Sequence, residues 1–366
     1  MRRISSVIAA AVVVAAANDT LAQGLSESTL RVAPQMVSYS IGNSGFKTTI
    51  SEFAIPIAFV MPLTSRLSFD IATAFATSSV DPDGGEKSTL SGLTDTQLRF
   101  NYTFGTDALV VTAGLNLPSG QYEVDPDKAA AASAIGNDFL AFPVSSFGNG
   151  LGGTGGIAVA RSAGGWNIGL AGSFRKSTEF GAYKLDDDAL RFQPADEIRL
   201  RAGADRFVGS GRLMVGFVYS MFGDDTCEGC ESGTSRTTYS TGNRVIGQAA
   251  FDVPVGGAQL FLAGWFLQRA EGKTVAGTAP GEMILNAQAA LGLTLGTFFF
   301  EPSVEIRRWT VDGDGAGSLV SVGARTQFDM GALYVSPSAA FVTGSYGVDG
   351  VDLSGFKIGA TIRRGN

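Results

Sequence analysis

The chain contains no histidine among its 366 residues. Histidine is the usual general base of hydrolases and a common ligand of zinc and haem. Its absence excludes serine–histidine catalysis, histidine-based zinc sites and haem ligation by histidine. We therefore expect that the protein is not an enzyme and that it carries no metal and no cofactor.

Cysteine is almost as scarce, because Cys227 and Cys230 are the only two in the chain. The Cys-Glu-Gly-Cys segment offers two sulfur ligands where structural zinc takes four, and no histidine completes the set. A redox pair is an alternative interpretation of this spacing. In an exported chain, a disulfide that pins the tip of a loop is favoured.

Charged residues and long apolar runs are also few. Asp, Glu, Lys and Arg make up 17% of the chain, which has a net charge of −7 and a pI of about 4.8. This balance argues against nucleic acid as a partner. Beyond the first residues, no apolar run reaches the length of about 18 residues that a transmembrane helix needs. Hydrophobic residues nevertheless make up 45% of the chain, spread over short segments.

The first 22 residues have the features of a cleaved secretion signal. Arg2 and Arg3 are followed by an apolar run from Ile4 to Ala17, which is too short to span a membrane. Small residues at the expected cleavage positions place the cut after Ala22. We therefore expect a signal peptide over residues 1–22 and a single domain over residues 23–366.

From there to the C-terminus, segments of about a dozen residues alternate large apolar with small or polar side chains. In the clearest of them, Leu98, Phe100 and Tyr102 alternate with Gln97 and Arg99. The connections between segments are alternately short and long. This pattern predicts an all-β fold, a transmembrane antiparallel up-and-down β-barrel of about 16 strands, with a range of about 14 to 18.

Such a barrel is expected in the outer membrane of a Gram-negative bacterium, in contact with lipid and lipopolysaccharide. An even number of strands places both termini on the periplasmic side, where the short turns lie. The oligomeric state is left open.

Several charged residues occur on strand faces opposite the large apolar residues. A mid-depth arginine facing lipid would cost about 2 to 4 kcal/mol, so these side chains should point into the barrel. They would line a charged, water-filled lumen that selects solutes, or pair across strands and hold the wall together; for each residue both interpretations stay open. The lumen-lining candidates are Asp70, Arg99, Arg175, Glu197, Arg199, Arg201, Asp205, Glu305, Arg307 and Arg325.

The longest connection runs over residues 118–150 and is rich in Ala, Gly and Ser. Loops of more than about 15 residues are usually functional or disordered. Phe139, Phe142 and Phe147 give this one an apolar patch that favours burial. We expect a constriction loop folded into the lumen, or a mouth for hydrophobic ligands, in preference to a disordered external loop.

Acidic loops occur at residues 81–85, 186–188, 224–225 and 312–315. Their carboxylates are the kind of ligand that Ca²⁺ prefers, but none has the full spacing of a calcium loop. Asp and Gly are also ordinary turn residues, and solvated turns are the favoured interpretation. Whether these loops bind Ca²⁺ is left open.

Two short segments resemble a known family. Residues 114–120 read GLNLPSG, and residues 145–161 read SSFGNGLGGTGGIAVAR. This part of the chain is similar to the outer-membrane channels associated with phenol-degradation pathways, which are related to fatty-acid and hydrocarbon channels. The resemblance implies a barrel that takes up small apolar or aromatic solutes.

The expected function is passive diffusion or uptake of small solutes, apolar or aromatic ones among them, through a charged lumen. One alternative is a non-conducting outer-membrane barrel with a structural or surface-interaction role. A further alternative is a secreted soluble all-β protein, such as a propeller or a sandwich.

Overall fold

The computed structural model describes residues 29–43, 45–105, 108–121, 123–185, 188–230, 236–274, 277–296, 298–331 and 333–364. The expected signal peptide over residues 1–22 lies outside these ranges, as do Asp186 and Asp187 of one acidic loop. No helix in the described ranges is long and apolar enough to cross a membrane.

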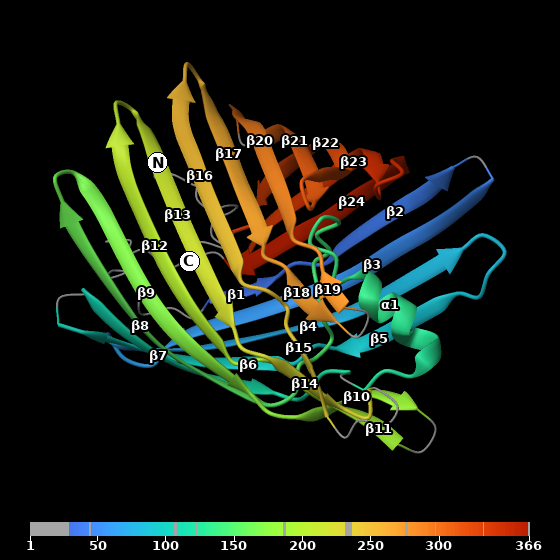
Figure 1. Ribbon diagram of the computed structural model, residues 1–366. Helices are drawn as coiled ribbons and strands as arrows, with labels where there is room; N and C mark the ends of the chain where they lie inside the picture. The colour runs from blue at the N-terminus through green and yellow to red at the C-terminus, as the bar shows by residue number, and fades with distance from the viewer. Residues whose placement is uncertain are drawn as a thin grey trace.

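The body of the molecule is one antiparallel sheet closed into a barrel (Figure 1). Its strands are β1 (Thr29–Val32), β2 (Gln35–Asn43), β3 (Phe46–Pro62), β4 (Leu67–Pro82), β5 (Ser88–Leu93), β6 (Thr96–Phe104), β7 (Leu109–Leu117), β8 (Gly152–Ala163), β9 (Trp166–Ser177), β12 (Glu197–Val208), β13 (Gly211–Phe222), β16 (Arg244–Val255), β17 (Ala258–Arg269), β20 (Glu282–Leu295), β21 (Phe298–Val311), β22 (Asp314–Asp329), β23 (Leu333–Tyr346) and β24 (Val351–Arg364).

The barrel is closed where both β1 and β2 pair with β24, the last strand. β1 and β2 follow one another between β3 and β24, and β5 and β6 follow one another along β4. Each of these two pairs is one interrupted strand, so the closed barrel has 16 strands. The predicted all-β fold and the predicted number of strands are confirmed.

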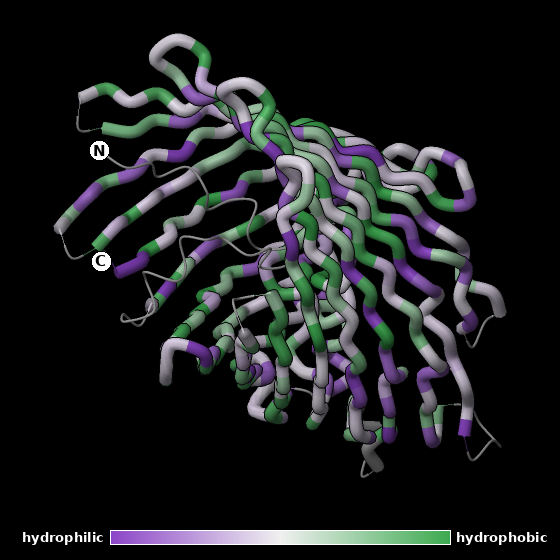
Figure 2. Tube along the Cα trace, turned by 90° about the vertical axis from the view of Figure 1, so that its left-hand side faces the viewer, coloured by the Kyte–Doolittle hydropathy of each residue, from purple (hydrophilic) through white to green (hydrophobic). Residues whose placement is uncertain are grey.

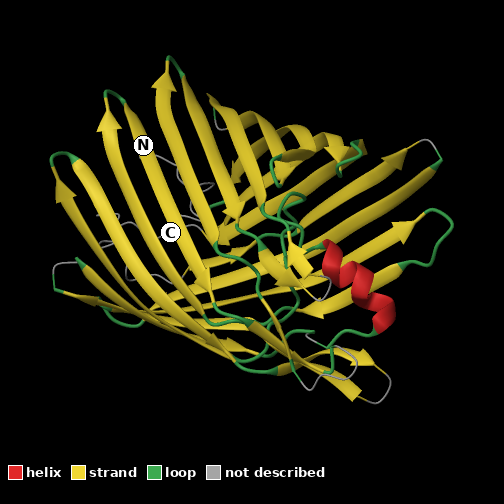
Figure 3. Ribbon diagram, in the orientation of Figure 1, coloured by secondary structure: helices red, strands yellow, loops and turns green. Residues whose placement is uncertain are grey.

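The remaining elements lie in the long connections. A second sheet contains β10 (Phe180–Leu185), β11 (Asp188–Gln193), β14 (Asp225–Glu228) and β15 (Thr237–Tyr239). A small hairpin contains β18 (Gly272–Thr274) and β19 (Gly277–Ala279). One 3₁₀ turn, η2 (Pro126–Lys128), leads into the single α-helix of the described residues, α1 (Ala129–Ala134), shown in red in Figure 3.

The connections give the barrel two distinct ends. At one end, which we call the short-turn end, the strands are joined by brief links such as the β8–β9 turn. Gly164 and Gly165 in that turn have φ values of 59° and 80°, the conformation that two-residue hairpin turns require. At the opposite, long-loop end lie the connections from β7 to β8, β9 to β12, β13 to β16 and β17 to β20.

Hydrophobic and hydrophilic residues alternate along many of the strands (Figure 2), and their exposure separates an apolar outer face from a mixed inner face. Ile306 is 55% exposed, whereas Arg307, the next residue, is 4% exposed. Phe100 and Leu200 are likewise exposed at 42% and 48%. A continuous belt of exposed aliphatic and aromatic side chains around a closed barrel is suited to a lipid surrounding.

The polar residues 80–91 predict a long loop from their sequence, and the structure corrects this expectation. Residues 88–93 form β5, which pairs with the far part of β4. The chain then bends at Thr94 and Asp95 before β6 continues along β4. Ser, Thr and Gly dominate β5, so its composition reads as a loop, although long-range pairing makes it a strand.

Candidate functional site: the lumen and its inner loop

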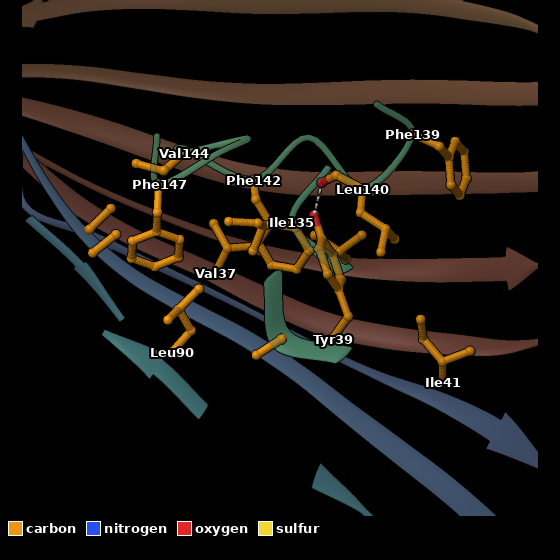
Figure 4. Packing of buried hydrophobic residues seen from close by; sticks show 14 of the residues in the cluster. Val37, Tyr39, Ile41, Leu90, Ile135, Phe139, Leu140, Phe142, Val144 and Phe147 are labelled. Atoms are coloured by element: carbon orange, nitrogen blue, oxygen red, sulfur yellow. Dashed lines mark hydrogen bonds between the residues drawn. The ribbon is translucent and has the colours of Figure 1, made fainter. Parts of the chain in front are cut away.

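Residues 118–151, the connection from β7 to β8, turn inward and pack against the inner wall of the barrel. We call this segment the inner loop. Phe139 and Leu140 are 0% and 1% exposed, and Phe142 and Phe147 are also buried. They share a cluster with Val37 and Tyr39, which lie on the inner face of β2 (Figure 4).

The apolar composition of residues 135–147 explains why this segment leaves the water. Burying a Phe or Leu side chain contributes about 1.5 to 3 kcal/mol each. The receiving surface is also apolar, since Val37, Tyr39 and Ile41 alternate on β2 with residues of the outer face. The constriction-loop candidates Phe139, Phe142 and Phe147 therefore face the wall of the barrel.

Three hydrogen bonds connect the inner loop to strands that are far apart in sequence. The Tyr39 hydroxyl donates to the Leu140 carbonyl at 2.9 Å, the dashed line in Figure 4. The Val144 amide donates to Oε1 of Glu52 on β3 at 2.8 Å. Arg307 on β21 donates from Nη1 to the Phe139 carbonyl at 2.6 Å. The loop is thus attached to the β2–β3 wall and to the β21 wall.

Asp95, at the bend between β5 and β6, holds both ends of the inner loop. Its carboxylate accepts from the Gly120 amide at 3.1 Å and from the Asn149 amide at 2.7 Å. It also accepts from Nδ2 of Asn116 at 2.7 Å, and that same nitrogen donates to the Gly150 carbonyl at 2.6 Å. Asp95 is 7% exposed, so these charge-assisted bonds are shielded from water.

Aromatic stacking adds a further contact around Phe139. Its ring stacks on Trp309 of β21 with a centroid distance of 5.4 Å and lies 6.2 Å from the ring of Tyr346 on β23. The Phe139 ring also packs against the backbone of Gly317. A Cβ at Gly317 would lie 3.1 Å from two atoms of that ring. The loop therefore packs at Phe139 against aromatic rings and strand backbone.

The helical part of the inner loop is held against β4 and β5. Ser78 donates to the Ala131 carbonyl at 2.9 Å, and Ser88 donates to the Asp127 carbonyl at 2.7 Å. Lys128, half-buried at the start of this part, contacts Asp125 at 2.5 Å. That hydrogen bond, with the charge of the same carboxylate, raises the pKa of Lys128.

Three of the predicted lumen-lining residues take part in ion pairs beside the inner loop. Arg307 pairs with Glu305, and Lys357 lies 3.4 Å from the other oxygen of Glu305. Arg325 pairs with Glu301 at 2.9 Å. The Arg307 guanidinium also lies over the ring of Trp265 at 5.5 Å. These charges are paired, and they hold the wall and the loop together.

Another group of predicted residues lies on the wall formed by β6 to β12. Arg175 and Arg199 both contact Glu197, at 3.5 Å and 2.6 Å. Arg201 is repelled by Arg199 and Arg99 and attracted by Glu197. Neither Arg99 nor Arg201 forms an ion pair with any residue of the described ranges.

The remaining two predicted residues are bound by neighbours. Asp70 lies opposite Arg99 in the strand register, but its carboxylate accepts from Nδ2 of Asn101 at 2.9 Å. Asp205 pairs with Arg212 at 3.0 Å and is 5% exposed. Both carboxylates therefore have structural partners.

Sequence reasoning missed three residues that hold the inner loop, namely Tyr39, Glu52 and Asp95. Glu52 offered a signal, since it is a carboxylate on the face of β3 opposite Phe53, where a lumen position is expected. Tyr39 and Asp95 had no comparable signal, because their importance depends on contacts with residues 140 and 149.

Cys227 and Cys230 are joined by a disulfide at the end of β14, with Cα atoms 5.8 Å apart. In the described part of the chain, no group of three or more His, Cys, Asp or Glu side chains could hold a metal ion.

A cavity of about 410 Å³ lies between the inner loop and the inner faces of β20 to β24, β1 and β2. Ala141 and Pro143 of the inner loop form one side of it. The opposite side carries hydroxyl and amide side chains, together with the paired Glu301 and Arg325. Arg31 and Arg363 line its short-turn end.

No protein-family model matches the chain, and no curated protein matches it. Among solved structures, a bacterial polysaccharide outer membrane secretin is 8% identical over 93% of this chain and 99% of its own, with a TM-score of 0.51. A loop L8 deletion mutant of OmpT, an outer membrane protein of Vibrio cholerae, is 12% identical over 92% and 99%, with a TM-score of 0.46. A mutant of Rh. blastica porin is 16% identical over 92% and 100%, with a TM-score of 0.40.

The likeness to the secretin is one of fold, that of an outer-membrane β-barrel. These neighbours do not include a transporter of the phenol-degradation type, so the resemblance of residues 114–120 and 145–161 remains a prediction.

Proposed function

We propose that the protein is a passive channel in the outer membrane of a Gram-negative bacterium, and that small anionic and polar solutes diffuse through its lumen. The closed barrel, the exposed apolar belt and the inward-facing charges support this proposal. The inner loop narrows the lumen at the long-loop end and leaves the β6–β12 wall free. Transport by this route needs no catalytic group.

The observation that carries the proposal is the pair of arginines without ion pairs, Arg99 and Arg201. Gly114 and Thr154 lie in the cross-strand row that joins Arg99 to Arg175, and Ala171 and Ala158 lie in the row of Arg201. These small side chains leave space beside the two arginines on the inner face. A cationic wall in a narrow aqueous passage raises the local concentration of anions.

Among the solutes implied by the family resemblance, those that carry a carboxylate, such as aromatic acids, fit this proposal. The rings of Phe139, Phe142 and Phe147 face the wall, so they do not present a hydrophobic surface to the passage. A neutral hydrocarbon would therefore have no matching surface there, whereas an aromatic acid would meet the arginines.

Planar lipid bilayers and liposome swelling test the proposal directly. The purified barrel should produce conductance steps, and a salt gradient should give a reversal potential of the sign expected for anion preference. Swelling should be faster with small carboxylates than with cations of the same size. A reconstituted barrel that is folded but gives neither conductance nor swelling would overturn the channel.

That negative result would favour a non-conducting barrel with a surface-interaction role. One observation fits this second candidate, since the sheet β10–β11–β14–β15 and the β18–β19 hairpin extend from the long-loop end. These elements offer an ordered surface beyond the membrane. Conductance separates the two candidates, because an interaction surface by itself moves no ions.

A further inference from the structure

Two arginines face each other near the short-turn end, where the first and last strands close the barrel. Arg31 of β1 and Arg363 of β24 are direct partners in the antiparallel register. Directly opposite residues of such a pair have Cβ atoms about 4.5 to 5.5 Å apart, and like charges at these positions are destabilising. Both residues line the cavity below the inner loop, and alternation along β24 places Arg363 on the same face as Lys357, with Arg31 beside it in the register.

Neither arginine is neutralised by a carboxylate of the described chain. The other cations of this cavity are paired, Arg325 with Glu301 at 2.9 Å and Lys357 with Glu305 at 3.4 Å. Nε of Arg31 is buried and has no hydrogen-bond partner within the described residues. An unsatisfied buried N–H of a charged group is costly, which points to a ligand that accepts from it.

Arg363 is positioned without losing its charge. Its guanidinium lies over the ring of Tyr334 on β23, with 4.9 Å from the carbon to the ring centroid. A cation–π contact of this kind orients the group but supplies no negative charge. The pair therefore presents two oriented guanidinium groups to one cavity.

The rest of the cavity is suited to a small organic acid. Gln35, Ser336 and Thr361 line it and can bind polar atoms, while Val37 and Pro143 supply apolar surface. Its volume of about 410 Å³ is within the range of small-molecule sites, about 300 to 1,000 Å³. Glu301 and Glu305 also line it, so a dianion would meet more repulsion than a monocarboxylate.

We propose that Arg31 and Arg363 form a binding site for the carboxylate of a small monocarboxylic acid at the short-turn end of the lumen. Guanidinium groups bind carboxylates through two parallel N–H···O bonds, and an anion between them removes their mutual repulsion. This site deepens the proposed function and rests on it, because it would bind an anionic solute near the short-turn end of the passage. Its occupancy can nevertheless be measured without any transport.

Isothermal titration of the full, detergent-solubilised barrel with sodium benzoate tests the site, with benzamide as the neutral analogue of the same shape. Benzoate should bind and benzamide should not. Arg31→Gln and Arg363→Gln should each weaken benzoate binding by at least about tenfold, since each removes charge-assisted hydrogen bonds. Arg31→Lys should retain part of the affinity for benzoate, because it keeps the positive charge and loses only the paired N–H donors of the guanidinium group.

Arg364→Gln is the matched control. Arg364 is exposed and follows Arg363 on the same strand, where alternation places its side chain on the outer face. Its binding should equal that of the unchanged barrel. The shift in gel mobility between heated and unheated samples should show that every variant is folded before it is titrated.

Equal binding of benzoate and benzamide would overturn the site, as would unchanged affinity in folded Arg31→Gln and Arg363→Gln barrels. Inorganic phosphate that binds as tightly as benzoate would overturn the assignment to monocarboxylates. A barrel that conducts but does not bind benzoate refutes the site and leaves the channel standing. Binding without conductance refutes the channel and leaves the site standing.

Discussion

Arg307 and Arg201 occupy equivalent places in the strand pattern, yet the two sides of the barrel use them differently. Arg307 is 4% exposed and contacts Glu305, the Phe139 carbonyl and the ring of Trp265. Arg201, on the opposite wall, forms no ion pair within the described ranges and is repelled by Arg99 and Arg199. One arginine holds the inner loop, and the other is available to a solute.

The inner loop accounts for part of this difference. Where the loop packs, at β2, β3 and β21, Tyr39, Glu52 and Arg307 each acquire a hydrogen-bond partner from it, and burial makes such a partner necessary. Where the loop does not reach, at β6 to β12, Arg175, Arg199 and Glu197 pair with one another, whereas Arg99 and Arg201 form no ion pair within the described residues. An inward charge in a barrel is thus structural or selective according to what covers it.

Substitution of Arg307 should have the largest effect. Arg307→Gln leaves the Phe139 carbonyl and part of Glu305 without a cationic partner, and loss of one member of a buried pair costs about 3 to 5 kcal/mol. Heat-modifiable gel mobility should show unfolding at a lower temperature. Arg308→Gln, on the exposed outer face, should stay within about 0.5 kcal/mol of the unchanged barrel. Equal losses of stability in the two variants would show that Arg307 does not hold the inner loop.

Asp95→Asn should free the ends of the inner loop while the barrel remains closed. The change removes the charge that three N–H groups share, and hydrogen bonds to charged groups contribute about 1.5 to 3 kcal/mol each. Lys128 is the only Lys or Arg within residues 118–151, so limited trypsin digestion should cut there faster. Asp83→Asn, an exposed aspartate bound to the Lys47 amide at 3.2 Å, is the control and should leave the rate unchanged.

Gly317→Ala should disturb the packing of the inner loop at Phe139, with a smaller effect on stability. The added Cβ would lie 3.1 Å from the Phe139 ring and 3.0 Å from the Ser345 carbonyl, and overpacking of this kind costs about 1 to 3 kcal/mol. Gly315→Ala meets no atom within 4 Å and serves as the control. Thermal unfolding of the two variants should differ; coincident curves would show that Phe139 is not firmly seated.

Arg99→Gln and Arg201→Gln should have the smallest effect on stability, since neither residue has an ion-pair partner among the described residues. Both should shift the reversal potential toward that of a non-selective channel, because they remove the positive charges of the β6–β12 wall that have no ion pair. Arg161→Gln, whose side chain shares the outer face of β8 with Ile157 and Val159, should leave selectivity unchanged. Anion preference that survives the double variant would place the selectivity elsewhere.

Much of the fold could be predicted because a barrel strand records its two faces in its own sequence. The alternation at residues 97–104 matches β6, where Phe100 is exposed on the outside and Arg99 faces inward. The alternating connection lengths correctly separated the two ends. The polar β5 and the strands of the β10–β11–β14–β15 sheet were not predicted. Their composition does not indicate strands, and they form because distant segments pair with them.

The candidate site was predictable only in outline. The lumen-facing positions of Arg175, Glu197 and Arg199 follow from periodicity, and so does the apolar nature of residues 139–147. Periodicity could not show that Phe139 rests on Trp309, or that Asp95 binds Asn149. Those contacts join residues 170 and 54 positions apart.

The sequence by itself determined the barrel, its approximate number of strands and the inward direction of its charges. These follow from side-chain alternation, a local property that each strand carries without its neighbours. The tertiary structure decided which arginines are clamped and which are free, and it brought Arg31 and Arg363 together where the sheet closes. Burial, ion pairing and register between the first and last strands depend on distant residues, so only the closed, folded chain specifies them.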